Sequence, residues 1–472
     1  MSASTEKKNR QAAREAGTDK KLQAAQEAAQ KAAVSKRRWT LGTIAVVLLI
    51  ALIILLNSPM MYRITTAESI GAKNYSPAEV RCAMQANNYS LYVGYLGEDY
   101  ARQVLEGSMT QSAALLQYAQ DQGITLTDAE KAALDESFAS LADAATANKV
   151  SDSRYLSAVY GKGVNQSVLR KNMEERVLSG KAYNTKELSL SFSDEQLDEY
   201  YASLNGESDL FSFAVYTVPV SEDLPDAEAY AAAEAIMTSY QEGEEGEPVE
   251  RLNDVIAEEF PDTAAEQQTN VSGSSLDAAY KEWMMDERQA GDITVVKTGA
   301  EDGYYVVLFQ DRSDNSDVVA QVRHILIMAE AQEDGSYTDE AKAEAKAKAE
   351  EILAIWEAGD KSELSFATLA GLYSQDSGSS SNGGLYSSVV PGQTVEEFDR
   401  FCFEDHNYGD TAIVYGESDS YAGYHIMFYI GTDTNRHVIA KNALTSDAMN
   451  EWMGLLTDGL EPVYHWASKL VF

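Results

Sequence analysis

Few side chains in this 472-residue sequence have the types and spacing that chemistry requires. All of its five histidines lie beyond residue 320, and two of them, His324 and His425, sit in strand-like segments. No H-x-x-x-H spacing offers a metal site, and no G-x-S-x-G element offers a hydrolytic nucleophile. We therefore expect no metal ion and no cofactor. We expect the two cysteines, Cys82 and Cys402, to pack as small, semi-buried apolar side chains. A long-range disulfide or a reactive thiol is the alternative.

An imperfect internal repeat places both histidines in the second of two copies. Phe211–Val218 and Gln321–Met328 are both strand-like and are each followed by an Ala/Glu-rich helix. The copies also close alike, at residues 303–307 and 423–427. In between, a gap-free alignment pairs Tyr280, Trp283, Met285, Gly291 and Asp292 with Phe398, Phe401, Phe403, Gly409 and Asp410.

The two copies differ at the positions whose side chains could take part in chemistry. The alignment sets Ala214 against His324 and Tyr305 against His425. The polar segment Tyr373–Leu385 (YSQDSGSSSNGGL) has only a vague counterpart in the first copy. The first copy is therefore predicted to be a degenerate scaffold.

Several short elements follow one another in order in the second copy. They are Val322–Ile327 (VRHILI), Trp356–Gly359 (WEAG), Phe366–Ala370 (FATLA), Tyr373–Ser379 (YSQDSGS), Asn382–Leu385 (NGGL), Pro391–Gln393 (PGQ), Glu397–Phe398, Phe403, Gly409 and Gly423–Ile426 (GYHI). Through them, residues 319–431 resemble the parvulin (PpiC-type) family of peptidyl-prolyl cis/trans isomerases over a whole domain. The layout before this domain is similar to that of extracytoplasmic foldases of the PrsA and SurA type.

The resemblance implies a site without covalent chemistry. An X–Pro bond rotates over a barrier of about 18–20 kcal/mol, and each tenfold in rate needs about 1.4 kcal/mol of differential binding. The resemblance places His324 and His425 at the floor of the site and Asp376 at the carbonyl that precedes proline. It implies that the other site residues bind substrate: Phe398, Phe403, Gln393, Thr394 and Ser420, with Phe398 and Phe403 as the cup for the proline ring.

The sequence departs from the family pattern near this cup. Thr394 follows Gln393 where the family usually has Met, and Gly383–Tyr386 (GGLY) replaces the common Gly-Asp-Leu-Gly turn. One extra residue lies between that turn and Gly392. These departures imply a smaller and more polar cup for the proline ring, from which we expect lower isomerase activity or a changed substrate preference.

The segment before the repeat is predicted to be helical. Three capping-box patterns mark helix starts at Ser76–Glu79, Thr127–Glu130 and Ser193–Gln196. No histidine occurs here, so residues 62–205 are expected to be a helical, chaperone-like domain. The apolar segment 437–472 is expected to form a C-terminal helix that packs on it.

Trp39–Leu56 has no charged residue, and its eighteen residues at about 1.5 Å rise span roughly 27 Å, enough for a bilayer core. Lys36, Arg37 and Arg38 precede it directly, so the positive-inside rule places the N-terminus in the cytoplasm. A buried core helix is the alternative. We expect a signal anchor at residues 39–57, with the bulk of the chain outside the cytoplasm.

Charge is distributed unevenly along the chain. Residues 1–38 hold ten basic and four acidic residues, net +6, whereas residues 39–472 hold 27 basic and 71 acidic residues, net −44. An acidic body would repel a phosphate backbone, so nucleic acid is excluded as a partner.

Together these features predict an α+β protein in six parts. The parts are a basic tail (1–38), a transmembrane anchor (39–57), a helical domain (62–205), a degenerate parvulin-like domain (211–312), an isomerase domain (319–433) and a C-terminal helix (437–472). We expect a prolyl isomerase and chaperone for unfolded secreted polypeptides that contain X–Pro bonds. The alternatives are a peptide-binding holdase with little isomerase activity, and a structural or adhesive surface protein.

Overall fold

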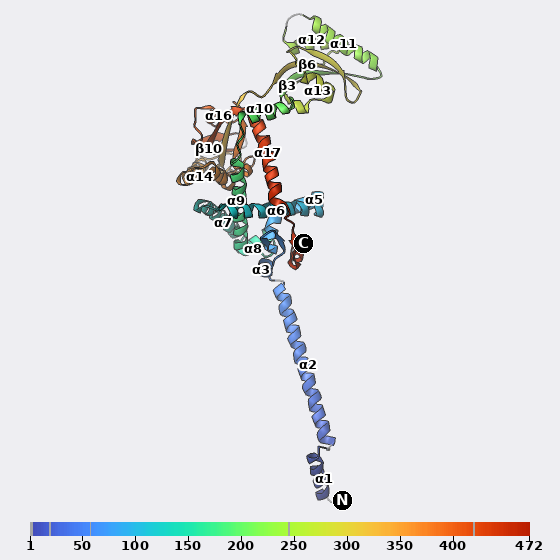
Figure 1. Cartoon of the computed structure of the whole chain (residues 1–472), viewed down its shortest axis with the longest axis vertical. Coiled ribbons are helices and arrows are strands. Elements are labelled where there is room, and N and C mark those ends of the chain that lie inside the picture. Colours follow the sequence, from blue (N-terminus) through green and yellow to red (C-terminus); the bar gives the residue numbers. More distant parts are fainter. Residues whose placement is uncertain (1–2, 18–19, 57, 244–245, 419–420) are drawn as a thin grey trace. The chain divides into compact units, whose positions relative to one another are not determined.

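The computed structural model describes residues 3–17, 20–56, 58–243, 246–418 and 421–472 (Figure 1). The chain forms two units, and each is described by itself. Unit 1 comprises residues 1–113, 137–173 and 459–472, and unit 2 comprises residues 114–136 and 174–458. Three long helices have residues in both: α6 (Glu98–Gln122), α7 (Asp128–Ala147) and α9 (Gln166–Leu188).

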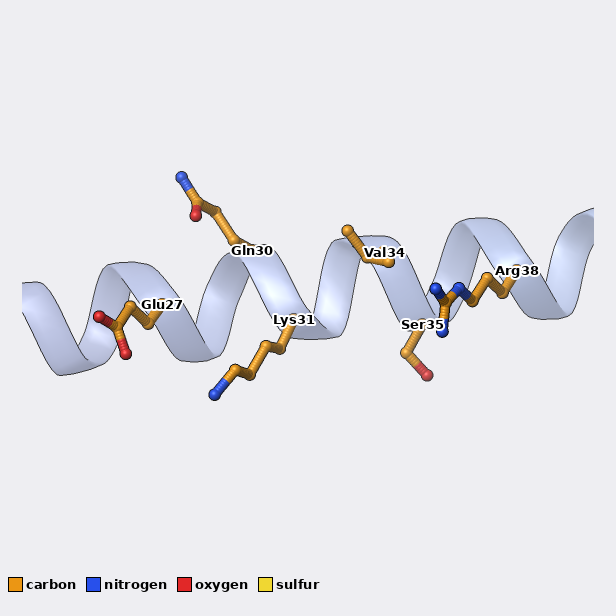
Figure 2. Close-up of a pocket in the computed structure, with 6 residues that line it drawn as sticks. All are labelled: Glu27, Gln30, Lys31, Val34, Ser35 and Arg38. Atoms are coloured by element: carbon orange, nitrogen blue, oxygen red, sulfur yellow. The ribbon is translucent and has the colours of Figure 1, made fainter.

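Unit 1 starts with helices α1 (Ala3–Glu15) and α2 (Lys20–Leu56). Within α2, Gln23–Leu55 is long and apolar enough to cross a membrane, and its apolar side chains are exposed, Leu48 by 63% and Ile54 by 66%. Figure 2 shows the part of α2 before the apolar stretch, with Glu27, Lys31 and Arg38 among the side chains of this one helix. The apolar stretch is therefore bounded by charge on its N-terminal side.

The rest of unit 1 combines short helices with a small antiparallel sheet. The helices are α3 (Met61–Ile64), α4 (Pro77–Ala86), α5 (Tyr89–Leu96), α8 (Asp152–Val159) and η3 (Trp466–Leu470). The strands β1 (Glu68–Ile70), β2 (Lys73–Tyr75) and β11 (Val463–Tyr464) lie in the order β11-β1-β2. The C-terminal segment thus supplies a strand to unit 1, with Tyr464 opposite Glu68.

All three predicted capping boxes form. The backbone N–H of each cap residue donates to the side chain three residues later, at 2.7 Å in Ser76–Glu79, 2.7 Å in Thr127–Glu130 and 3.0 Å in Ser193–Gln196. The reciprocal bonds from the third residue's N–H to the cap hydroxyl are also present. These contacts span three residues, so the sequence is sufficient to specify them.

Unit 2 contains two sheets with the same topology. The first has strands β3 (Leu210–Pro219), β4 (Glu266–Ser272), β5 (Ile293–Lys297) and β6 (Gly303–Ser313), in the order β4-β3-β6-β5. The second has strands β7 (Val318–Met328), β8 (Leu385–Val389), β9 (Thr411–Glu417) and β10 (Ala422–Thr434), in the order β8-β7-β10-β9. The helices occur at matching places: α11 (Asp226–Glu242), α12 (Pro248–Glu259), η1 (Gly273–Ser275) and α13 (Ala278–Met285) in the first copy, and α14 (Asp339–Ala358), α15 (Glu363–Tyr373), η2 (Ser380–Asn382) and α16 (Glu396–Phe403) in the second.

Details of register support the duplication. A bulge interrupts the β3–β6 pairing between Phe309 and Asp311, and another interrupts the β7–β10 pairing between Tyr429 and Gly431. The turn before the edge strand also repeats. The Gly291 N–H donates to the Phe309 carbonyl at 2.9 Å, and the Gly409 N–H donates to the Tyr429 carbonyl at 2.9 Å.

The predicted equivalence of Ala214 and His324 is wrong by one residue. His425 pairs with Leu326, which lies two residues after His324. Tyr305, the counterpart of His425, pairs with Thr217, which lies two residues after Val215. Val215 therefore takes the place of His324. Ala214 packs in the core under α11 and α12, on the opposite face of its sheet. A slip of one residue in a strand turns every side chain to the other face. The first copy still lacks a histidine pair, because Val215 and Tyr305 occupy the two positions.

Two further helices flank the copies. Helix α10 (Asp194–Ser203) precedes the first copy and contacts α17 (Asn435–Thr457), which follows the second. His437 of α17 lies 3.1 Å from Asp198 of α10. Trp452 of α17 packs edge-on against Tyr118 of α6, with ring centroids 5.1 Å apart, whereas Trp466 of η3 is 56% exposed.

Candidate functional site

Two neighbouring strands bring the histidines together. His324 on β7 and His425 on the antiparallel β10 are only 2% and 4% exposed. Their Nδ1 atoms lie 3.0 Å apart, and their rings stack with centroids separated by 5.1 Å. The sheet therefore joins two residues that are a hundred positions apart in the sequence.

The loop after α15 carries Asp376 and is fastened to the edge of β7. The Leu326 N–H donates to Ser374 Oγ at 3.1 Å, and the Gln375 N–H donates to the Leu326 carbonyl at 2.9 Å. The Met328 N–H donates to the side-chain oxygen of Gln375 at 2.6 Å. These bonds fix the backbone on both sides of Leu326 and set Asp376 beside His324.

A two-glycine turn closes the other end of this loop. Gly383 and Gly384 have φ angles of +73° and +75°, which favour glycine. The His324 N–H donates to the Gly384 carbonyl at 2.8 Å, and a Cβ at Gly384 would lie 2.2 Å from the His324 carbonyl oxygen. Only glycine allows the turn to approach the histidine strand this closely.

Asp376 accepts several hydrogen bonds. Its Oδ2 atom accepts from His324 Nε2 at 2.9 Å, from Ser379 Oγ at 2.5 Å and from the Tyr386 hydroxyl at 3.3 Å, and its Oδ1 accepts from the Gly378 N–H at 3.1 Å. The bond from His324 comes first among the effects that hold the pKa of this carboxyl well below its usual value; burial opposes it. Asp376 is therefore ionised at neutral pH.

Four side chains form a connected series of hydrogen bonds. An ionised carboxylate only accepts, so His324 Nε2 donates to Asp376. The Nδ1 atoms of the two histidines share a hydrogen bond, and Nε2 of His425 lies 2.9 Å from the Tyr421 hydroxyl. Burial, followed by the neighbouring His324, lowers the pKa of His425 to about 3, so this histidine is neutral at pH 7.

Aromatic rings stand over the histidine pair. The Phe398 ring, from α16, lies edge-on to both imidazoles with centroid distances of 5.3 Å. Tyr386, from β8, lies 4.9 Å from His324 and 6.0 Å from Phe398. Phe398 is 3% exposed, whereas Tyr386 is half-buried. Of these two rings, Tyr386 therefore presents the more accessible surface beside Asp376.

The other predicted site residues are placed differently. Phe403 is half-buried at the end of α16, against the cluster that contains Phe398. The Gln393 side chain accepts from the Val390 N–H at 3.1 Å and thereby closes its own turn. The buried Thr394 hydroxyl has no hydrogen-bond partner among the described residues. Ser420 lies outside the described residues.

Sequence reasoning missed three hydroxyl groups. Ser379 and Tyr386 bind Asp376, and Tyr421 binds His425. Ser379 belongs to the YSQDSGS element, and its spacing of three residues from Asp376 was a usable signal. Tyr386 stood out only as a departure from the family turn, and nothing in the sequence distinguished Tyr421.

The described residues contain no cluster of three His, Cys, Asp or Glu side chains suited to a metal ion. Cys82 and Cys402 are free and buried, as expected for small apolar side chains, and burial raises the pKa of each thiol to about 12. Neither thiol is set up for reaction.

Comparison with known proteins finds sequence matches to this region and to a larger part of the chain. Residues 304–428 match the sequence profile of the PPIC-type PPIase domain, from within β6 to near the middle of β10. The chain is 28% identical over 307 residues to chaperone SurA of Alkalilimnicola ehrlichii, covering 63% of this chain and 66% of that protein. It is 26% identical over 325 residues to chaperone SurA of Burkholderia orbicola, covering 64% and 66%. The chain thus spans just under two thirds of the length of these curated relatives.

Among solved structures, the foldase protein PrsA from Streptococcus pneumoniae covers 86% of this chain and 98% of its own, with 11% identity and a TM-score of 0.20. PrsA from Bacillus cereus covers 80% and 92%, with 14% identity and a TM-score of 0.19. Superpositions this loose add no weight. The sequence matches carry the conclusion: residues 304–428 match a PPIC-type PPIase domain, and the chain is similar to SurA chaperones over just under two thirds of its length.

Proposed function

We propose that the protein is a membrane-anchored peptidyl-prolyl cis/trans isomerase that assists the folding of secreted polypeptides outside the cytoplasm. The observation that carries this proposal is the set of contacts around His324. Its ring touches His425, Asp376 and Phe398 at once. The family match supports the same activity for this region.

The mechanism follows from what holds the X–Pro bond planar. Resonance gives the C–N bond partial double-bond character and places partial negative charge on the carbonyl oxygen. An ionised Asp376 near that oxygen opposes this charge and favours the twisted form, in which the double-bond character is lost. Because Oδ2 of Asp376 already accepts three hydrogen bonds, the carboxylate acts through its charge and not as a nucleophile.

Phe398 and Tyr386 provide the apolar surface for the proline ring. The histidines hold the floor rigid, and His324 orients the carboxylate through its Nε2–H. Phe403, Gln393, Thr394 and Ser420 belong to the proposed substrate-binding surface on the strength of the family resemblance. The first copy, with Val215 and Tyr305 at the histidine positions, has a scaffold or peptide-binding role without isomerisation.

The basic residues Lys36–Arg38 before the apolar half of α2 support an N-terminus in the cytoplasm. The residues that follow the anchor, from about residue 58 onward, then meet unfolded polypeptides on the outer side. Protease added to intact cells should remove them. Protection of residues beyond about 60 would contradict this orientation.

A holdase with little isomerase activity is the second candidate. Thr394 favours it, because its buried hydroxyl has no hydrogen-bond partner in the described part of the chain, where the family has an apolar Met. This substitution weakens the grip on a proline ring.

The test is isomerisation of X–Pro peptides by the full chain in detergent. Phe398→Ala should raise KM and slow turnover, because the proline ring loses its main contact. Tyr280→Ala is the matched control, since Tyr280 holds the corresponding place on α13 and should leave the rate unchanged. Equal rates for wild type and Phe398→Ala would refute the site, and no turnover in either would favour the holdase.

A further inference from the structure

The part of unit 1 that follows the anchor differs in charge from unit 2. Residues 58–113, 137–173 and 459–472 hold ten basic and eight acidic residues, net +2. Unit 2, residues 114–136 and 174–458, holds 17 basic and 63 acidic residues, net −46. Beyond the anchor, a net positive charge therefore belongs only to the unit that carries the anchor.

Three basic side chains of this unit gather around α3. The Arg81 guanidinium and the Lys162 ammonium lie 5.2 and 4.9 Å from the centroid of the Tyr62 ring. The Arg63 Nε–H donates to the Gly163 carbonyl at 3.0 Å. Within the described residues, none of the three cations lies within 4 Å of a carboxylate, so their charge is not balanced at close range.

The C-terminal helix η3 lies beside these cations. The Arg81 guanidinium donates to the Leu470 carbonyl at 2.8 Å, and the His465 N–H donates to the Ala67 carbonyl, three residues after α3, at 2.9 Å. Helix η3 adds the exposed Lys469. The four basic side chains, here called the basic cluster, are Arg63, Arg81, Lys162 and Lys469.

Exposed apolar side chains occur in the same two segments. Met60, directly before α3, and Ile64, its last residue, are 55% and 61% exposed, and Trp466 at the start of η3 is 56% exposed. Large apolar side chains next to basic ones are typical of surfaces that lie on a bilayer, and Trp is enriched at the membrane–water interface. The composition of this surface therefore fits lipid.

The connection to the anchor is short. Helix α2 ends at Leu56 and α3 begins at Met61, so five residue steps of at most about 3.6 Å, roughly 18 Å in all, separate them. The field of a charged lipid surface reaches about one Debye length, ~8 Å at physiological salt. If α2 spans the bilayer, the basic cluster is therefore held close to that field.

From these observations we infer that α3, η3 and the basic cluster form a docking surface for anionic lipid headgroups, which holds unit 1 against the membrane. The inference rests on the membrane anchor in the proposed function and is independent of isomerisation. Lipid phosphates attract the basic cluster, and Ile64 and Trp466 enter the headgroup region. The same lipids repel the acidic unit 2, so the basic cluster is the point of contact.

The experiment uses the full chain in vesicles of phosphatidylcholine, with or without about one third phosphatidylglycerol. Met60→Cys carries a nitroxide label, since the native thiols are buried. In the anionic vesicles, collision of the label with a water-soluble nickel chelate should fall severalfold, and about 0.5 M salt should restore it. A label at Glu333→Cys, on an exposed turn of unit 2, is the control and should stay accessible. Equal access of the Met60 label in both kinds of vesicle would overturn the inference.

Two double variants locate the source of the docking. Lys162→Gln with Lys469→Gln should lower the ratio of docked to undocked chains by at least about tenfold, because each basic residue near an anionic surface contributes about fivefold. Lys131→Gln with Lys346→Gln removes the same charge from unit 2, at side chains that are 52% and 54% exposed, and should leave the ratio unchanged. An equal change in both would overturn the inference, because only the overall charge would matter.

Inorganic phosphate separates a lipid surface from a site for a free anion. At constant ionic strength, phosphate and chloride should release the label equally, because both act only by screening. Release by phosphate alone would show a phosphate-ion site and would overturn the docking surface.

An alkaline wash of the vesicles separates this inference from the proposed anchor. A chain that survives the wash but shows no dependence on lipid charge would refute the docking surface alone. A chain that is washed off, yet at neutral pH binds anionic vesicles more tightly than neutral ones, would refute the anchor alone. Loss in the wash without any dependence on lipid charge would refute both.

Discussion

The hydroxyl of Tyr386 lies 3.3 Å from Oδ2 of Asp376, so one side chain belongs both to the aromatic cup and to the hydrogen bonds of the carboxylate. Its ring meanwhile contacts His324 and Phe398. Burial, and then the charge of Asp376, raises the pKa of the phenol, which therefore remains a donor at neutral pH.

Replacing Tyr386 separates these two roles. Tyr386→Phe keeps the ring and removes one hydrogen bond of about 0.5–1.5 kcal/mol, so kcat should fall by up to about tenfold while KM stays nearly constant. Tyr386→Ala should raise KM as well, because the proline ring loses a wall. Steady-state isomerisation kinetics measure both, and the same KM in the two variants would remove the ring from the cup.

The charge of Asp376 is expected to matter more than its shape. Asp376→Asn and Asp376→Ala should both lower kcat by at least about tenfold, with KM little changed, since the interaction is made mainly in the transition state. The rates are compared at equal concentrations of folded protein. A wild-type rate in the Asn variant would show that the charge is not used.

Breaking the histidine pair should destabilise the domain. His324→Ala or His425→Ala leaves the partner as a buried polar group without its hydrogen bond, which costs about 1–3 kcal/mol in unfolding free energy. Removing both histidines should cost less than the sum of the single changes, because no orphaned partner remains. Urea unfolding of the three variants tests this, and strict additivity would contradict a direct contact.

Thr394→Met should raise isomerase activity. The change replaces a buried hydroxyl that has no hydrogen-bond partner among the described residues with an apolar side chain, which should add apolar contact with the proline ring worth roughly 1 kcal/mol, or about fivefold in kcat/KM. Thr411→Met, on the edge strand β9, is the control. Thr368→Met is not used, because Thr368 is buried in α15 and a larger side chain would overpack the core there. An equal gain in both variants would contradict a specific role for position 394.

A pH dependence should arise in unit 1 at Glu68. This side chain is 1% exposed, and its Oε1 atom has no hydrogen-bond partner among the described residues. Burial, and then the neighbouring Glu106, raises the pKa of Glu68 to about 7, whereas Arg102 lowers it. The folded state therefore binds a proton more tightly than the unfolded state, and stability falls as pH rises from about 4.5 to about 7.

Glu68→Gln removes this penalty. The unfolding free energy of the variant minus that of wild type should rise by about 1–3 kcal/mol as pH increases from about 4.5 to about 7, and should stay constant above that range. Hydrogen-exchange protection of residues 66–86 in the full chain, compared between variants at each pH, measures the gain. Glu98→Gln, which changes an exposed glutamate, is the control. Parallel curves of stability against pH for wild type and Glu68→Gln would contradict a buried Glu68 with a raised pKa.

The sequence alone determined the features that depend on near neighbours or on composition. The capping boxes at Ser76, Thr127 and Ser193 form because their partners lie three residues away. The apolar half of α2 needs no tertiary contact to be recognised. His324, His425, Asp376 and Phe398 became candidates because an ordered set of motifs survives in the second copy, and in the structure His324 contacts each of the other three.

Only the tertiary structure decided which face of a strand each residue uses and which distant groups meet. Ala214 and Val215 are neighbours in the sequence, yet the sheet register places only Val215 on the face that α13 covers, because successive strand residues point to alternate faces. Tyr386 and Tyr421 joined the site through hydroxyl contacts that depend on strand pairing and loop closure. Glu68 is the same case in unit 1: the strand that lies opposite it comes from residues near the C-terminus, so no local pattern could mark it as buried.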